Sequence, residues 1–178
     1  SDVIVIVRQL CKALSRAHAL GLVHRGLRPE NVFLCDTPDD APWIKLLGFS
    51  VGQTSETKDP HAEARMRSFL SPEQITESSF GEPRSDLWAL GVLTFLMLTG
   101  QLPFEGTTVP ALTSAICVAP LPRPTAHGLD LPVAIDGWFA KACARAPDAR
   151  FGDATSMARA LVDALFGDVS RDLVDMSA

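Results

Sequence analysis

The segment between Ser85 and Thr99 limits the possible folds of this chain more than any other feature. Apolar side chains occupy nearly every face of the helix that this segment would form, so the helix would have no polar stripe to turn toward water. Such a helix is stable only when other elements surround it. The sequence therefore predicts a buried central helix that ends at Gly100. Its apolar stretch from Leu87 to Leu98 has 12 residues, which is too short to span a bilayer.

Other helices and a short hairpin are expected around this central segment. The clearest helix is the N-terminal one over 3–17, in which apolar residues recur at helical spacing. Further helices are predicted over 109–118, 133–145 and 154–166. Two short apolar runs, Val32–Leu34 and Trp43–Leu47, flank a turn-forming stretch and predict a small β-hairpin. The predicted fold class is therefore mainly α with a small β-hairpin.

Composition and charge narrow the class of protein. The chain has 178 residues, of which 47% are hydrophobic, and this is enough apolar material for one domain or one large lobe. A formal net charge of −5 argues against a nucleic-acid-binding surface and against a polybasic membrane patch. The four cysteines have neither CxxC spacing nor metal-ligand spacing with histidine, so free thiols are expected. Neither nucleic acid nor membrane insertion is predicted for this segment.

Several short motifs follow one another along the chain. They are His24-Arg25-Gly26-Leu27-Arg28-Pro29-Glu30-Asn31, Gly48-Phe49-Ser50, Ser71-Pro72-Glu73, the spaced set Asp86, Trp88 and Gly91, and Ala146-Pro147-Asp148-Ala149-Arg150-Phe151. In order and spacing they resemble the H-R-D-L-K-P-E-N, D-F-G, A-P-E, D-x-W-x-x-G and D-P-x-x-R-F motifs of eukaryotic-type Ser/Thr protein kinases. The resemblance covers residues 3–166 and belongs to the large, C-terminal lobe of that family.

The resemblance implies a domain organisation. Residues 1–166 would form a protein-kinase-like large lobe, and residues 167–178 would be a C-terminal tail or linker. The small lobe of the family lies outside this chain, and the class becomes α+β if that lobe is included. Because the chain does not open with Met and begins almost at once in helical sequence, we expect it to be an excerpt from a longer polypeptide.

The same resemblance implies a degenerate catalytic site. Gly26 stands where the family has its catalytic-base Asp, and Gly48 stands where D-F-G places the Asp that binds metal. No catalytic residue, metal or cofactor is therefore predicted. Arg28 replaces a Lys and keeps a positive charge, Asn31 is retained, and Phe33 lies in the strand position that contacts the base. These three residues form a predicted vestigial nucleotide and phosphate site.

Residues with an architectural role stand where the family pattern puts them. This set comprises His24, Arg25, Phe49, Glu73, Asp86 and Arg150. The resemblance pairs Glu73 with Arg150 as an internal ion pair and makes His24 a packed, hydrogen-bonded core residue. The other histidines, His18, His61 and His127, have no partner pattern and are predicted to be surface groups.

Two local interpretations remain open. Arg25 is either a plain internal hydrogen-bonding residue or the partner of a phosphorylated side chain in the following loop, among Thr54, Ser55, Thr57 and Ser68. The acidic cluster of Asp36, Asp39 and Asp40 beside the hairpin is either a solvated turn or a stand-in metal site.

These expectations combine into a functional hypothesis. The chain is expected to be a catalytically inactive protein-kinase-like domain, a pseudokinase, that acts as a regulatory or scaffolding module. Its partner would be another protein, such as an active kinase or a client, and its location would be cytoplasmic. The alternative is an atypical Ser/Thr protein kinase that uses ATP and Mg²⁺, with a small lobe upstream.

Overall fold

The computed structural model describes residues 2–35, 42–49, 66–76, 81–127 and 130–167. Its helices are α1 (Asp2–Ala19), α3 (Pro72–Thr76), α4 (Pro83–Thr99), α5 (Val109–Cys117), α6 (Ala134–Ala142) and α7 (Ala154–Phe166), with single 3₁₀ turns η1 (Pro29–Asn31), η2 (Pro124–His127) and η3 (Pro147–Ala149). Strands β1 (Val32–Cys35) and β2 (Trp43–Leu46) form an antiparallel pair. The predicted class, mainly α with a small β-hairpin, is confirmed.

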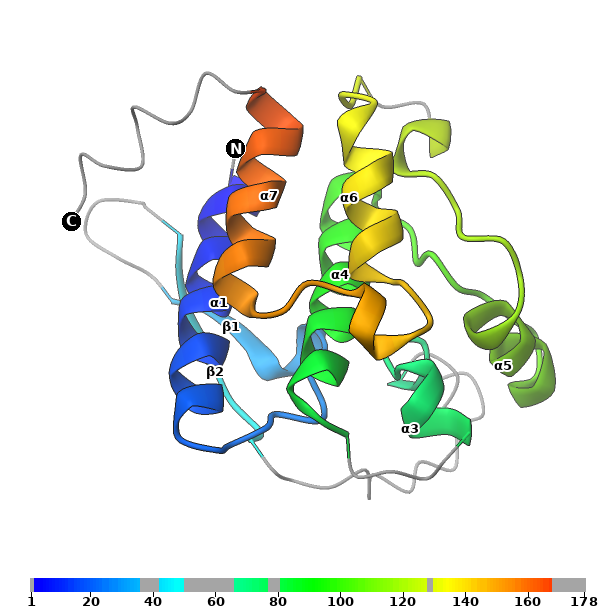
Figure 1. Ribbon diagram of the computed structural model, residues 1–178, viewed down its shortest axis with the longest axis horizontal. Coiled ribbons are helices and arrows are strands. Elements are labelled where there is room, and N and C mark those ends of the chain that lie inside the picture. Colours follow the sequence, from blue (N-terminus) through cyan, green and yellow to red (C-terminus); the bar gives the residue numbers. More distant parts are fainter. Residues whose placement is uncertain (1, 36–41, 50–65, 77–80, 128–129, 168–178) are drawn as a thin grey trace.

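Helix α4 is the central element that the sequence predicted. Every residue from Ser85 to Phe95 is buried, and α1 and α6 both pack against this helix (Figure 1). The helix begins at Pro83, two residues before the predicted start, because proline suits a first-turn position that needs no N–H donor. It ends where Gly100 adopts φ of 73° and donates its N–H to the carbonyl of Leu96.

The hairpin is fastened to α1 by a side chain that the sequence did not single out. The Gln9 amide donates to the carbonyl of Pro42 (2.6 Å) and accepts the N–H of Ile44 (3.1 Å). Ile44 is buried against α1, and on the opposite face of the hairpin Phe33 and Trp43 are each at least half exposed. The face with Phe33, Trp43 and Lys45 is the open face of the hairpin, and the opposite face is covered at Ile44 but not at Leu34, which is 67% exposed.

Helix α6 is shorter than the sequence predicted. The expected helix over 133–145 ends at Ala142, so that prediction is wrong at its C-terminal end. The carbonyls of Ala144 and Arg145 accept hydrogen bonds from the Arg150 guanidinium at 2.7 and 3.1 Å. After Ala142 the chain forms a turn whose carbonyls hold Arg150, in place of a further turn of helix.

Arg150 joins this turn to the start of α4. It is only 3% exposed, and its terminal nitrogens donate to both carboxylate oxygens of Glu73, each at 2.7 Å. It also donates to the carbonyl of Arg84 (2.9 Å), and its guanidinium lies 5.0 Å from the centre of the Trp88 ring. The structure thus contains the internal ion pair that the resemblance implied.

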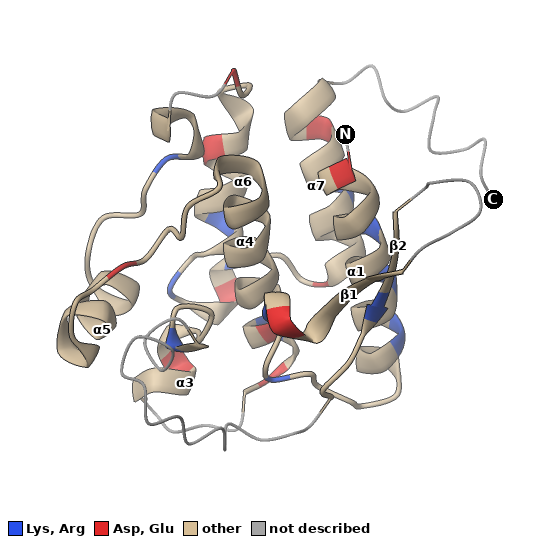
Figure 2. Cartoon of the chain, turned by 180° about the vertical axis from the view of Figure 1, so that it is seen from behind, with Lys and Arg blue, Asp and Glu red and all other residues tan. Residues whose placement is uncertain are grey.

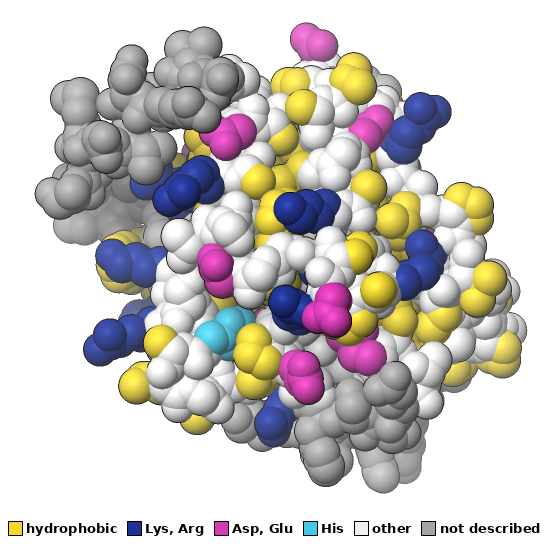
Figure 3. Space-filling model, in the orientation of Figure 1, with side chains coloured by type: hydrophobic (Ala, Val, Ile, Leu, Met, Phe, Trp, Pro, Cys, Tyr) yellow, Lys and Arg dark blue, Asp and Glu magenta, His cyan; other side chains and the backbone are white. Residues whose placement is uncertain are grey.

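Among the described residues, Asp86 and Arg150 are the charged residues that are buried, and the others are partly or fully exposed. Figure 2 shows charged residues on the central helix α4 as well as on the outer helices, and α5 has none. On the face in Figure 3, basic and acidic side chains are interspersed with apolar ones. Among the described residues, no helix combines the length and apolar character that a membrane crossing needs.

The environment of Glu73 predicts how stability changes with pH. Burial alone would raise the pKa of Glu73, but the hydrogen bonds and charge of Arg150 outweigh it and lower the pKa from 4.5 to about 2. The ionised carboxylate therefore stabilises the fold above about pH 4.5, and this contribution disappears as the pH falls toward 2.

We expect Glu73→Gln to lower the free energy of unfolding by about 3 kcal/mol near neutral pH, because it leaves the buried Arg150 without its counter-ion. Urea unfolding of both proteins at a series of pH values should show this difference shrinking as the pH falls below 4.5. Asp148→Asn is the matched control, since Asp148 is 96% exposed and pairs with Arg84 at the surface. A difference that stays constant down to low pH would contradict this account.

Candidate functional site

The loop between α1 and β1 is held by one carboxylate from the buried helix α4. Asp86 is 1% exposed and accepts the backbone N–H groups of His24 and Arg25, each at 2.8 Å. Arg25 has φ of 66°, in the left-handed region that non-glycine residues rarely adopt. The two charge-assisted hydrogen bonds stabilise the loop in this unfavourable conformation.

Asp86 has a third contact, with His18, and this contact corrects the prediction that His18 is a surface group. His18 was expected at the surface, but its side chain is 13% exposed and its Nε2 lies 2.7 Å from Asp86 Oδ2. The expectation was wrong because His18 lies one turn after Leu14 on the buried side of α1. The four-residue spacing from Leu14 to His18 could have indicated that His18 is partly buried. His127 is also partly buried, with its ring edge-on to Phe95 at 5.1 Å.

His24 is fully buried and links the loop to the segment that follows β2. Its Nε2 lies 2.8 Å from the carbonyl of Leu47, and its Nδ1 accepts the N–H of Gly26 at 3.3 Å. Because a carbonyl only accepts, these contacts put the proton on Nε2. Burial lowers the pKa of His24, so the ring is neutral near pH 7. The ring also packs 4.6 Å from that of Phe49.

Asn31 brings the two loops together. Its side-chain Nδ2 donates to the carbonyl of Gly26 (2.7 Å), and its backbone carbonyl accepts the N–H of Leu47 (2.9 Å). A Cβ on Gly48 would lie 3.0–3.1 Å from the Asn31 amide, and Gly48 has φ of 81°. A Cβ on Gly26 would meet nothing closer than 3.9 Å. The space beside Gly48 is therefore filled by Asn31, and the space beside Gly26 is open.

The remaining predicted site residues lie near this junction. Arg28 precedes η1 with its side chain 25% exposed, and its Nε is 3.9 Å from Glu30 Oε2. Phe33 lies on the open face of the hairpin, half exposed. The structure thus brings Gly26, Asn31 and Gly48 into contact distance.

Several predictions fall where no geometry can be given. Ser50, the acidic cluster of 36–40 and the candidate phosphorylation sites Thr54, Ser55 and Thr57 lie outside the described residues. Ser68 is described and is buried. Within the described ranges, no group of three or more His, Cys, Asp or Glu side chains could hold a metal ion.

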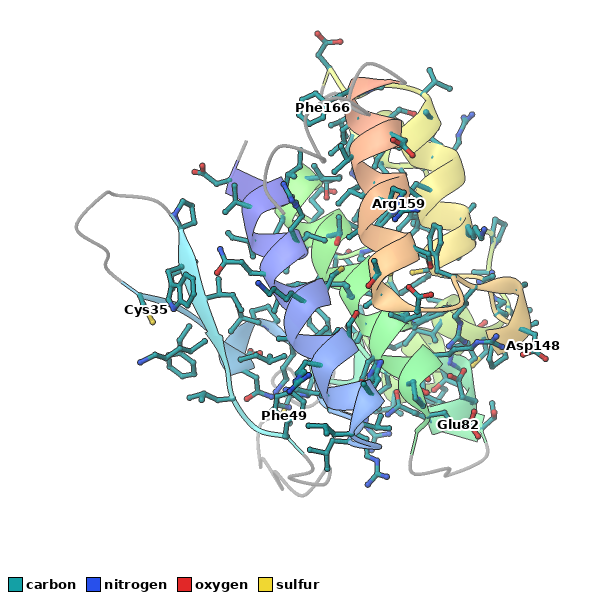
Figure 4. The ribbon with its side chains drawn as sticks, turned by 60° about the vertical axis from the view of Figure 1, so that its left-hand side comes forward. Cys35, Phe49, Glu82, Asp148, Arg159 and Phe166 are labelled. Atoms are coloured by element: carbon teal, nitrogen blue, oxygen red, sulfur yellow. The ribbon has the colours of Figure 1, made fainter. Side chains whose placement is uncertain are left out.

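The site lies at one end of the helical body. Figure 4 shows Phe49 beside the lower end of α1, and Arg159 lies well away from it on α7. The junction is therefore formed by the end of α1, the hairpin and the start of α4. This junction can orient backbone groups, and it can offer a ligand the Arg28 guanidinium and the Asn31 amide.

Comparisons with known proteins identify relatives. Pkn1 of Myxococcus xanthus, a serine/threonine-protein kinase, is 32% identical over 167 residues, which are 92% of this chain and 24% of Pkn1. PknL of Mycobacterium tuberculosis, another serine/threonine-protein kinase, is 32% identical over 158 residues, which are 87% of this chain and 38% of PknL. The chain therefore spans about a quarter to two-fifths of the length of these relatives.

A solved structure agrees in fold. The crystal structure of Rad53 residues 1–466 in complex with AMP-PNP superposes with a TM-score of 0.69 over 90% of this chain and 39% of that one, at 22% sequence identity. The model of the protein kinase domain family matches residues 1–125, which is more than half of the chain. From this match and the shared fold, the chain belongs to the protein kinase domain family.

Proposed function

We propose that this chain is the large lobe of a pseudokinase, a protein-kinase-like domain that does not transfer phosphate and serves as a regulatory or scaffolding module. The observation that carries the proposal is the pair of glycines on either side of Asn31. Motif alignment places the catalytic base of the family at Gly26 and its metal-binding Asp at Gly48.

The geometry around Asn31 supports the proposed loss of phosphoryl transfer. Phosphoryl transfer needs a group that orients the acceptor hydroxyl and carboxylates that hold Mg²⁺ on the phosphates. A glycine supplies neither, and the Asn31 amide fills the space that a Gly48 side chain would need. Asn31 alone is a neutral ligand and a poor Mg²⁺ site.

A retained framework favours a role in binding. The residues that hold the loops, Asp86, His24 and the Glu73–Arg150 pair, keep their hydrogen bonds. The open face of the hairpin exposes Phe33 and Trp43, which gives another protein an apolar surface to contact. An active kinase or a client is the class of partner that we propose, and the cytoplasm is the proposed location.

The alternative is an atypical ATP- and Mg²⁺-dependent Ser/Thr protein kinase. The relatives Pkn1 and PknL are named serine/threonine-protein kinases, and Arg28 and Asn31 could still contact phosphates. In this alternative, Arg28, Asn31 and residues of a small lobe upstream would carry the phosphates.

A transfer assay separates the two functions. The chain, and any longer polypeptide that contains it, should show no transfer of phosphate from ATP with Mg²⁺ to itself or to a general protein substrate. PknL prepared in the same way is the positive control for the assay. Transfer that disappears in Arg28→Gln or Asn31→Ala would refute the proposal, because it would assign catalysis to this site.

A double-mutant cycle tests the claim that Asn31 fills the second position. We expect Gly48→Asp to cost about 1–3 kcal/mol in unfolding free energy, since it meets the Asn31 amide and has a positive φ. In an Asn31→Ala background the cost should fall. Gly26→Asp is the matched control, because its Cβ has room and its φ is not left-handed.

Equal costs for Gly48→Asp and Gly26→Asp, with no coupling to Asn31, would contradict this account. Urea unfolding of the unmodified chain, the two single variants and the double variant gives the four free energies that the cycle needs.

A further inference from the structure

Three basic side chains form a strip along the exposed side of α1. Arg8, Lys12 and Arg16 stand at every fourth position of this helix, and all three are exposed (Figure 2 shows the basic residues of α1 in blue). Residues with this spacing share one face of a helix, about 6 Å apart along its axis. None of the three forms an ion pair or a hydrogen bond with another described residue. Because like charges at this spacing repel each other, this basic strip favours a negatively charged occupant.

The last helix ends beside the first turn of α1. Helices α1 and α7 pack against each other and run in opposite directions (Figure 1). The Ser15 hydroxyl lies 3.1 Å from that of Thr155, near the start of α7. Because both helices rise about 1.5 Å per residue, Phe166 at the end of α7 comes level with the first turn of α1. Gly167 then ends α7 with φ of 73°, so the chain leaves this helix at the N-terminal end of the basic strip.

The sequence that follows Gly167 carries the opposite charge. Residues 168–178, which we call the acidic tail, contain three Asp and one Arg and so have a formal side-chain charge of −2. The carboxylates stand at Asp168, Asp172 and Asp175, a spacing that would place them on one face of a helix. An apolar residue follows each Asp directly, so the apolar residues would form a second face next to the acidic one. The acidic tail thus has both the charge and the spacing that complement the basic strip.

The tether to α7 makes the acidic tail a better occupant than a separate peptide. Exposed ion pairs are individually weak, so three of them would hold a free peptide only in the millimolar range or more weakly. A short tether supplies an effective concentration that is itself on the order of millimolar. Val5 and Phe166 are both exposed at this end of the strip, and they offer apolar surface for the tail to cover. A helix over the tail would be about 16 Å long, and the strip spans about 12 Å, so the lengths agree.

We propose that the acidic tail folds back along α1 and binds the basic strip through its three carboxylates. The tail then runs from the end of α7 toward the loop that follows α1, and it covers the side of α1 that faces away from α4. An acidic segment of another protein can reach the strip only by displacing the tail, which makes the strip a regulated docking surface. The inference does not rest on the proposed loss of catalysis, because neither the strip nor the tail belongs to the junction around Asn31.

Backbone order parameters of the full chain, measured by ¹⁵N NMR relaxation, test the proposal. In about 0.02 M NaCl we expect the amides of residues 169–176 to have order parameters above about 0.7, approaching those of a rigid helix. In about 0.5 M NaCl these values should fall below about 0.6, because salt screens exposed ion pairs. The amides of α4 are the internal control and should stay near about 0.85 in both solutions.

A charge swap connects the ordering of the tail to the basic strip. Lys12→Asp and Asp172→Lys should each lower the order parameters of residues 169–176 below about 0.6 in dilute salt, because each places like charges opposite one another. The double variant exchanges the two charges and should restore the ordering. Lys45→Asp is the matched control. It makes the same change at an exposed position on the open face of the hairpin, away from α1, and should leave the tail ordered.

The proposal is overturned if residues 169–176 of the unmodified chain have order parameters below about 0.6 in dilute salt, or if Lys12→Asp leaves them ordered. It is also overturned if Lys45→Asp releases the tail as fully as Lys12→Asp does, since the effect would then come from net charge alone. Ordering that appears only at concentrations where ultracentrifugation detects a dimer would assign the strip to the tail of a second copy. Binding of phosphatidylserine vesicles by a chain with a free tail would assign the strip to a membrane surface, and either result contradicts the fold-back.

Discussion

The carboxylate of Asp86 is the interaction on which the rest of the site depends. It comes from the buried helix α4 and reaches across to two consecutive backbone N–H groups, those of His24 and Arg25, and to the ring of His18. A buried carboxylate is costly unless it is hydrogen-bonded, and here three groups contact its two oxygens. The end of α1, the following loop and the hairpin are thereby placed relative to the core of the lobe.

This arrangement explains how the loop keeps its shape with glycine at positions 26 and 48. The groups that fix the loop are backbone amides, a buried histidine and the Asn31 amide. None of these contacts uses a side chain at Gly26 or Gly48. Glycine at both positions therefore removes no hydrogen bond from this framework. The carboxylate that lies beside Arg28 is that of Glu30, 3.9 Å from Nε.

Much of the fold could be predicted, for identifiable reasons. Apolar side chains on nearly every face of residues 85–99 predicted that α4 is buried, and the resemblance to protein kinases predicted the Glu73–Arg150 pair. The contacts of Gln9 and His18 could not be derived in the same way, since they join side chains to groups 33 to 68 positions away in sequence. The early end of α6 could not be derived either, since the turn that follows it is tied by its Ala144 and Arg145 carbonyls to the Arg150 side chain. Periodicity reports which face is buried, but not which polar groups meet there.

The most direct test is the hydrogen exchange of the His24 and Arg25 amides, followed by NMR on the full chain. If Asp86 anchors the loop, both amides should exchange as slowly as those in the middle of α4, which open only when the lobe unfolds. Asp86→Asn should then speed their exchange far more than that of the α7 amides. If both amides of the unmodified chain exchange as fast as those of an unstructured peptide, the account is contradicted.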